Sequence, residues 1–311
     1  MDGLLAELLV PFDYDYMRKA IWVSALVGGT CAFLSAYLML KGWSLMGDAL
    51  GHAIVPGVAV AAILGAPFAA GAFVAGLFAS LAMYVVRQKT KLREDAVIGL
   101  VFTSLFALGL LIASMRPTAV SIQTIVLGNI LAISDEDIVQ VAVIAGVSLA
   151  VMALLWKDLM VTFFDEAHAR SIGLRVTTLK IVFFTLLSAC TVAALQTVGA
   201  CLVIAMVVTP GATAYLLTDR FGRLIGISVA LGVSTSAVGA YLSYFLDGAT
   251  GGVIVTLQTL LFLAAFVFAP RHGVLASRRR RAAGLGETRE AARAREAIQA
   301  REAIQAREVA P

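Results

Sequence analysis

The sequence predicts an all-α polytopic membrane protein with about eight or nine transmembrane helices. Three observations support this fold class. Of the 311 residues, 60% are hydrophobic and only 14% are charged, and the mean hydropathy is +0.92. Soluble domains carry about 25% charged residues. Apolar segments long enough to cross about 30 Å of hydrocarbon also recur along most of the chain.

Nine such segments are predicted, at 20–40, 44–65, 68–86, 95–114, 137–156, 178–197, 199–217, 224–246 and 252–270. If the N-terminus is outside, the basic residues between them fall on the cytoplasmic side, as the positive-inside rule requires, and the C-terminus is cytoplasmic. These residues are Lys41, Arg87, Lys89, Lys91, Arg93, Lys157, Arg170, Arg175, Lys180, Arg220, Arg223, Arg271 and Arg278 to Arg281. Arg18 and Lys19 fit this orientation poorly, so eight crossings or an inside N-terminus remain alternatives. The clustering argues against nucleic acid as a partner.

The acidic opening, with Asp2, Glu7 and Asp13, predicts no removable signal peptide. Cys31, Cys190 and Cys201 are scattered through apolar segments without paired spacing, and we interpret all three as packing residues.

Two stretches interrupt the pattern of crossings. Residues 115–134 contain polar residues between two crossings, and we predict a re-entrant or surface helix there. Residues 164–174 are polar and predicted to be cytoplasmic, with Asp165 as N-cap of a short helix and Gly173 at its C-terminal end. A short helix held between two crossings is suited to docking on another protein.

The chain divides into a transmembrane unit, 1–277, and a charged tail, 278–311. The tail holds four consecutive arginines and a duplicated Ala-Arg-Glu-Ala-Ile-Gln hexamer. A six-residue repeat gives no continuous apolar stripe on a helix of 3.6 residues per turn, so a solvated, partly helical tail is favoured over a coiled coil. The arginines also suit contact with anionic lipid.

Asp48 and His52 form the candidate metal site. Four residues apart on one helix, their Cβ atoms lie about 5–6 Å from each other. Ionisable groups at membrane depth are functional candidates by default. A histidine hydrogen-bonded to a neighbouring helix is the alternative, which the nearby Asp48 disfavours. Carboxylate with imidazole suits Mn²⁺, Fe²⁺ or Zn²⁺ better than Cu⁺ or Mg²⁺, and a dimer axis would double the two ligands.

Two prolines and four further residues bear on the ion path. Pro56 and Pro210 lack the N–H that would continue a helix, so both helices should be kinked or broken, although for Pro210 a kink that only improves packing is an equal alternative. Glu94 and Asp95 are candidates for ion exit, but carboxylates in a first helical turn beside basic residues favour a structural role. Gln196 and Met206 are weaker candidates for lining the path.

At this point the sequence resembles the permease subunits of ATP-binding-cassette importers for manganese, zinc or iron, the ABC-3 family, from about residue 12 to 275. The segments that carry the resemblance are Lys41 to Leu50 together with His52, Arg93 to Gly99, Gly128 to Leu131, Phe164 to Arg170, and Val208 to Arg220. The family pattern usually has Ser at the position of Gly51, a change that should leave the Asp48 and His52 geometry intact. The tail lies outside the resemblance.

The resemblance implies a type II importer fold like that of the vitamin B12 permeases, in the plasma (inner) membrane of a bacterium. Two permease subunits, identical or paralogous, enclose one path. An extracytoplasmic metal-binding protein delivers Mn²⁺, Fe²⁺ or Zn²⁺, and a cytoplasmic ATPase drives the cycle. Asp48 and His52 match the residues regarded as coordinating or gating the ion. The coupling helix that docks on the ATPase matches Asp165, Glu166, Ala167, His168, Ala169, Arg170, Ser171, Ile172 and Gly173.

The residues themselves leave rival functions open. The chain has no GxxxxGK[ST] phosphate loop, so ATP hydrolysis by that route would need a partner, and we expect a transport subunit without a permanent cofactor rather than an enzyme. The main alternative is an ATP-independent secondary transporter or channel for divalent cations, although such proteins usually carry more intramembrane acids. A membrane scaffold acting through its basic tail would leave Asp48 and His52 unexplained.

Overall fold

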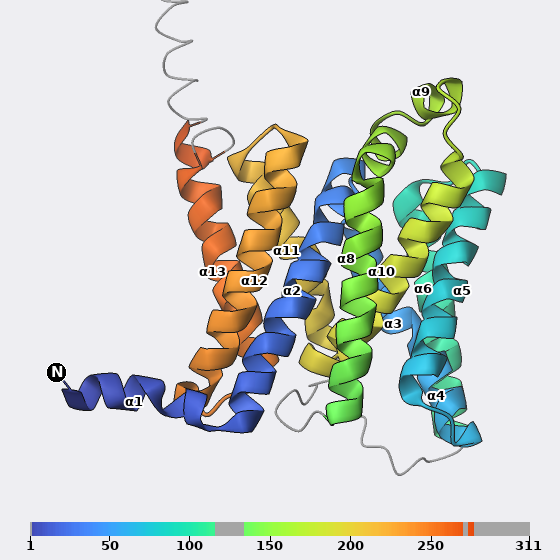
Figure 1. Cartoon of the computed structure of the whole chain (residues 1–311). Helices are drawn as coiled ribbons and strands as arrows, with labels where there is room; N and C mark the ends of the chain where they lie inside the picture. The colour runs from blue at the N-terminus through green and yellow to red at the C-terminus, as the bar shows by residue number, and fades with distance from the viewer. Residues whose placement is uncertain (1, 116–133, 270–272, 277–311) are drawn as a thin grey trace, which may run out of the picture.

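The computed structural model describes residues 2–115, 134–269 and 273–276, and in this part of the chain all regular structure is helical (Figure 1). The predicted helix at 115–134 falls almost entirely outside the described residues, and the 278–311 tail falls wholly outside them. The helices are α1 (Asp2–Asp13), α2 (Asp15–Lys41), α3 (Leu45–Ala53), α4 (Val55–Leu64), α5 (Phe68–Lys89), α6 (Glu94–Met115), α8 (Asp135–Phe164), α9 (Glu166–Ser171), α10 (Val176–Val198), α11 (Ala200–Leu217), α12 (Phe221–Leu246) and α13 (Thr250–Phe268).

Within the described residues, eight segments are long and apolar enough to cross a membrane, with α3 and α4 together counting as one. The remaining predicted crossing, 199–217, corresponds to α11, whose apolar part, Val203–Leu217, is shorter. Figure 1 shows α9 at one end of the bundle and α1 at the other, with α10 to α13 running alternately between these ends. The junctions that carry the basic clusters therefore share the α9 end. The all-α membrane fold is confirmed.

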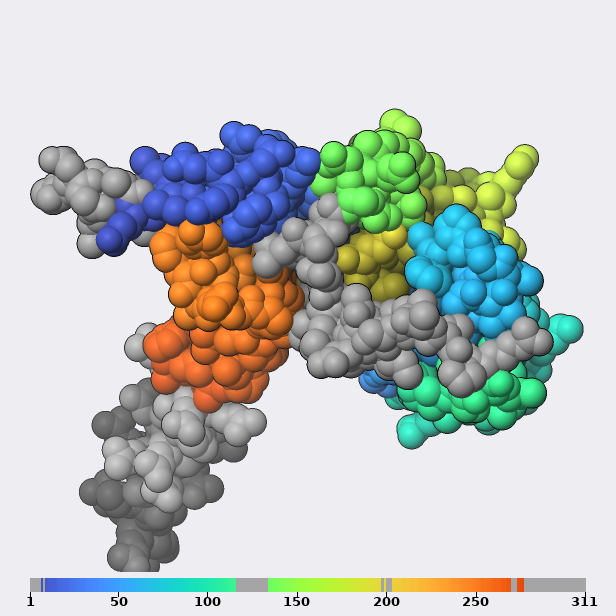
Figure 2. Space-filling view, turned by 90° about the horizontal axis from the view of Figure 1, so that it is seen from below, coloured from blue at the N-terminus to red at the C-terminus, as the bar shows by residue number. Residues whose placement is uncertain are grey.

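The sequence prediction missed α1, which lies across the end of the bundle rather than along it (Figure 1). Seen from that end, α12 and α13 lie on one side of the molecule and α4 to α6 on the other (Figure 2). Phe12 stacks on Tyr241 of α12 with ring centroids 5.7 Å apart, which ties the end of α1 to the bundle. Arg18 and Lys19, which fitted the predicted orientation poorly, are paired here, Arg18 with Asp15 at 2.6 Å and Lys19 with Asp135 at 2.5 Å.

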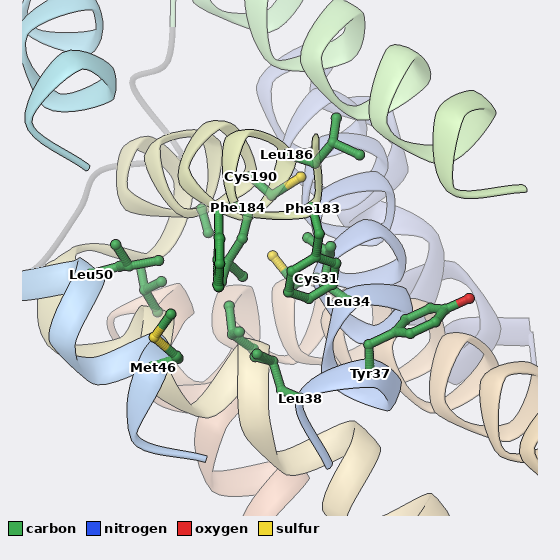
Figure 3. Close-up of a cluster of buried hydrophobic side chains, with 14 of the residues drawn as sticks. Cys31, Leu34, Tyr37, Leu38, Met46, Leu50, Phe183, Phe184, Leu186 and Cys190 are labelled. Atoms are coloured by element: carbon green, nitrogen blue, oxygen red, sulfur yellow. The ribbon is translucent and has the colours of Figure 1, made fainter. Parts of the chain in front are cut away.

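An aromatic cluster forms the centre of the core between α2, α8 and α10 (Figure 3). Tyr37 is fully buried, contacts Phe163 and Phe183 with centroids 6.0 Å away, and donates its hydroxyl to the Trp156 carbonyl at 3.0 Å. Cys31 and Cys190 are free thiols buried in the same core, as packing residues should be. The Cys201 side chain lies outside what the structure describes.

Close helix contacts depend on small residues, as membrane helices require when apolar burial against lipid contributes little. In α2, a Cβ on Gly28 would lie 2.6 Å from the Gly232 carbonyl of α12 and closer still to Ser236 Oγ. In α4, a Cβ on Gly57 would meet the Gly71 backbone of α5, and the reverse also holds. These two crossings bring backbones together directly.

Gly28→Ala should therefore destabilise the protein by about 1–3 kcal/mol, because a methyl group must push α2 from α12. Gly226→Ala is the matched control, since a Cβ on this α12 glycine meets nothing within 4 Å. It should be neutral or stabilising by up to about 1 kcal/mol, from helix propensity. Unfolding of the two purified variants in detergent tests this, and equal losses would contradict it.

Candidate metal site and coupling helix

The helix that carries Asp48 and His52 is interrupted just beyond them. Ile54 separates α3 from α4 as a single turn residue with φ −77° and ψ −16°, and Pro56 falls in the first turn of α4. This confirms the interruption predicted from the missing N–H of Pro56. Gly109 of α6 closes over the break, because a Cβ there would lie 2.7 Å from Pro56 N.

Asp48 and His52 contact each other directly. His52 Nδ1 lies 3.1 Å from Asp48 Oδ1 and 3.1 Å from the Asp48 carbonyl oxygen. Both groups accept, so the geometry favours the tautomer with hydrogen on Nδ1 and leaves Nε2 as the ring nitrogen able to ligate a metal. A carboxylate that accepts a hydrogen bond from a histidine in this way fixes the orientation of the ring.

The rest of the site is apolar. The imidazole packs edge-on against Phe106 of α6 at 5.4 Å and lies 6.0 Å from Phe102. Sequence reasoning did not assign these two phenylalanines, because nothing in the sequence fixes which face of α6 meets α3. Their rings restrict the imidazole on one side.

The pair faces outward from a mostly buried helix. The Asp48 and His52 side chains are 36% and 30% exposed, whereas Met46, Ala49 and Leu50 are buried. Among the described residues, no group of three or more His, Cys, Asp or Glu side chains could hold a metal ion. One copy of this chain therefore offers two candidate metal ligands on an open face.

Glu94 is engaged in structural contacts. Its carboxylate accepts the indole N–H of Trp43 and pairs with Arg87 at the end of α5. These contacts agree with the structural role favoured for Glu94 from its place in the first turn of α6. Asp95 is exposed beside it.

The other two path candidates differ in their surroundings. Met206 is fully buried in the core, and the buried Gln196 Oε1 has no hydrogen-bond partner in the described part of the chain. Their place on an ion path stays a prediction.

The second proline does not interrupt its helix. α11 runs through Pro210 as one helix, and Ser35 of α2 hydrogen-bonds to its backbone there. Ser35 Oγ donates to the Val208 carbonyl at 3.0 Å and accepts the Gly211 N–H at 3.0 Å. The sequence predicted a kink or a break at Pro210. α11 is not broken there, and its bonds to Ser35 agree with the packing alternative.

The predicted short helix is present as α9. Asp165 caps it, with Oδ1 accepting the N–H groups of Ala167 at 2.9 Å and His168 at 3.0 Å. Gly173 ends it with a positive φ of 85°, which glycine adopts without strain. Figure 1 shows α9 projecting from the end of the bundle, and Ile172 beside it is 55% exposed.

A buried ion pair anchors α9 to α10. Glu166 accepts from Lys180 at 2.5 Å and from Arg170 at 2.7 Å, and the Lys180 side chain is only 4% exposed. Partial burial opposes the charge of Glu166, but the hydrogen bonds from Lys180 and Arg170 outweigh it and lower the pKa of this carboxyl group. The sequence signal for this anchor was a lysine inside an apolar segment.

A multi-pass helical bundle with an interrupted membrane helix, an open Asp–His pair and a projecting short helix is the architecture expected of a transport permease. The chain belongs to the ABC 3 transport family, which it matches over residues 13–269. It is accordingly an ABC-transporter permease, and the predicted resemblance is confirmed.

Similar proteins cover nearly the same length. The chain is 69% identical over 277 residues to the chelated iron transport system membrane protein YfeC of Yersinia pestis, covering 89% of this chain and 94% of that one. It is 49% identical over 280 residues to the manganese transport system membrane protein MntB of a Synechocystis species, covering 89% and 90%. A chain in the structure of PsaBC from Streptococcus pneumoniae with a Fab superposes with a TM-score of 0.77 at 32% identity, covering 86% and 97%.

Glu166→Gln should destabilise the protein by about 3 kcal/mol, because it leaves the buried Lys180 ammonium without its counter-charge. Lys180→Met should cost less, since Glu166 keeps Arg170. Glu136→Gln, at an exposed site on α8, is the neutral control. Thermal unfolding in detergent measures all three, and an equal loss in Lys180→Met would contradict the buried-charge argument.

The same pair predicts a pH dependence. Because the folded-state pKa of Glu166 is lowered, its contribution is complete above the unfolded pKa of a glutamate and is lost as the pH falls through the folded value. The stability difference between the native protein and Glu166→Gln should therefore shrink at acid pH. A difference that is constant with pH would assign the effect to packing alone.

Proposed function

We propose that this chain is the permease subunit of an ATP-driven importer of divalent transition metal ions, Mn²⁺, Fe²⁺ or Zn²⁺. The observation that carries the proposal is the Asp48 and His52 pair, held in contact on the open face of an interrupted helix, in a chain of the ABC 3 transport family. The named relatives are iron and manganese transport proteins, which supports a first-row metal as cargo.

The chemistry of the pair suits this cargo. One carboxylate and one imidazole are borderline ligands, and first-row divalent ions accept such mixed oxygen and nitrogen sets. A site with few ligands also releases its ion readily, which transport requires. Tight, saturated coordination would stop the cycle.

A second permease subunit would complete the site. The partly exposed face of α3 that carries this pair is the surface that such a subunit would cover, and the subunit would bring further ligands to the same ion. The partner is a second copy of this chain or a paralogue.

The energy would come from a cytoplasmic ATPase that docks on α9, and the cargo from an extracytoplasmic metal-binding protein on the α1 side. This orientation places the basic junctions and the C-terminus in the cytoplasm, in agreement with the positive-inside rule. The capped, projecting α9 with exposed Ile172 offers the ATPase a rigid contact.

Uptake of radioactive Mn²⁺, Fe²⁺ and Zn²⁺ into vesicles that contain the whole complex tests the proposal. Asp48→Ala and His52→Ala should each reduce ATP-dependent uptake by about 100-fold, because misplacing a single ligand in an organised site has effects of this size. Thr256→Ala removes an exposed hydroxyl group within α13, away from the α1 and α9 ends, and should have no effect.

The outcomes separate the candidate functions. Uptake that persists without ATP would replace the importer by the secondary transporter or channel. ATP-driven uptake unchanged in both variants would keep the importer and remove Asp48 and His52 as its site.

Ile172→Asp should prevent the ATPase subunit from copurifying with the permease, because it places a charge in the proposed contact. Leu92→Asp, in the exposed α5–α6 junction at the same end, is the matched control and should retain the ATPase. Loss of the ATPase from the control alone would move the docking site from α9 to that junction.

A further inference from the structure

Trp43 joins the metal-site helix to its neighbours at the α9 end of the bundle. It precedes Leu45, the first residue of α3, by two positions, and it is 5% exposed. Its indole N–H donates to Glu94 at the start of α6, and the Arg87 guanidinium of α5, which pairs with the same carboxylate, lies 5.3 Å above the indole ring. A buried indole and a partly exposed charge pair thus fix one residue.

The opposite side of the indole rests on α10. Trp43 stacks on Phe184 with centroids 5.5 Å apart and an interplanar angle of 20°. Phe184 follows Lys180 by four residues and therefore shares its helix face. Lys180 is the residue that holds Glu166 of α9, so the first turns of α10 carry both the anchor of α9 and the contact of Trp43.

Tyr84 of α5 bridges these two contacts on α10. The Lys180 ammonium lies 5.7 Å from the Tyr84 ring, and the same ring is 6.3 Å from Phe184. The set of Trp43, Glu94, Arg87 and Phe184, which we call the Trp43 clamp, is therefore continuous with the α9 anchor through packed side chains.

A small pocket lies beside the Trp43 clamp. Trp43, Glu94 and Arg87 line it together with Met46 of α3, Met83 of α5 and Val97 of α6. Methionine side chains adapt to altered packing more readily than branched ones. The clamp is thus bonded on its polar side and meets adaptable side chains towards α3.

We propose that the Trp43 clamp is the positioning element that couples α9 to the metal site, so that displacement of α9 by the ATPase reorients α3 and with it Asp48 and His52. The inference rests on the proposed function and assigns Trp43 and Glu94 to its regulation. Glu94 then acts on transport through Trp43 and not as an ion ligand.

Trp43→Phe tests the coupling, because it keeps a stacking ring and removes the N–H. In the reconstituted complex, metal transported per ATP hydrolysed should fall about threefold or more, while the unfolding temperature changes little. Trp22→Phe, on an α2 residue 76% exposed, is the matched control and should leave the ratio unchanged. Adding Glu94→Ala to Trp43→Phe should cause less further loss than Glu94→Ala causes alone, since both remove the same bond.

An unchanged ratio in Trp43→Phe would overturn the proposal. So would a loss of unfolding temperature and complex yield without any change of the ratio, because that pattern belongs to a purely structural residue.

A second measurement is independent of the cargo. The chain has three tryptophans, so Trp22→Phe with Trp156→Phe leaves Trp43 as its only indole. With an ATPase subunit whose own tryptophans are replaced, acrylamide quenching of Trp43 should change about twofold when ATP and vanadate trap the complex, and Lys180→Met should abolish this change.

Quenching that does not respond to trapping would overturn the coupling even if metal uptake is ATP-driven. Quenching that responds to trapping, in a complex that shows no ATP-dependent metal uptake, would keep the coupling and reject the metal importer. The two proposals therefore fail separately.

Discussion

Irregular backbone cannot face hydrocarbon, and this constraint governs the site of the protein. The helix that carries Asp48 and His52 breaks before Val55, so its backbone groups at membrane depth must be enclosed by protein. The glycines at the break meet this requirement. Gly57 meets Gly71 of α5 directly, and Gly109 of α6 lies against Pro56. Without glycine at these positions the neighbouring helices could not close over the interruption.

The helix packing also determines which ionisable side chains are matched by an opposite charge within the fold. Glu94 and Lys180 lie close to the same core, yet each is matched by an opposite charge, Glu94 by Arg87 and Lys180 by Glu166. Within the described residues, the polar contacts of Asp48 and His52 are with each other, and both side chains stay about one third exposed. Their polar groups are therefore left for the metal-binding role proposed above.

The α9 end of the bundle is built differently from the α1 end. At the α9 end, ion pairs and aromatic rings lock α9, α10 and the start of α3 together, with the Phe163 and Phe183 rings 4.7 Å apart behind them. At the α1 end, the contacts include the Phe12 and Tyr241 stack and the Lys19 pair with Asp135. On the coupling proposed above, the packing at the α9 end would transmit a displacement of α9 to the interrupted helix in the middle of the bundle.

The sequence by itself determined the membrane class, nearly all helix positions, the break at Pro56 and the Asp165 cap. These features are local: an apolar segment of sufficient length has one stable form in lipid, a proline removes its own N–H, and a cap acts within four residues. Only the tertiary structure decided that Ser35 hydrogen-bonds to the backbone of α11 beside Pro210. It also decided that Glu94 accepts the indole N–H of Trp43 and that Lys180 pairs with Glu166 of α9. Those outcomes depend on how each helix is rotated against residues distant in the chain, and nearly uniformly apolar helices carry little sequence signal for that rotation.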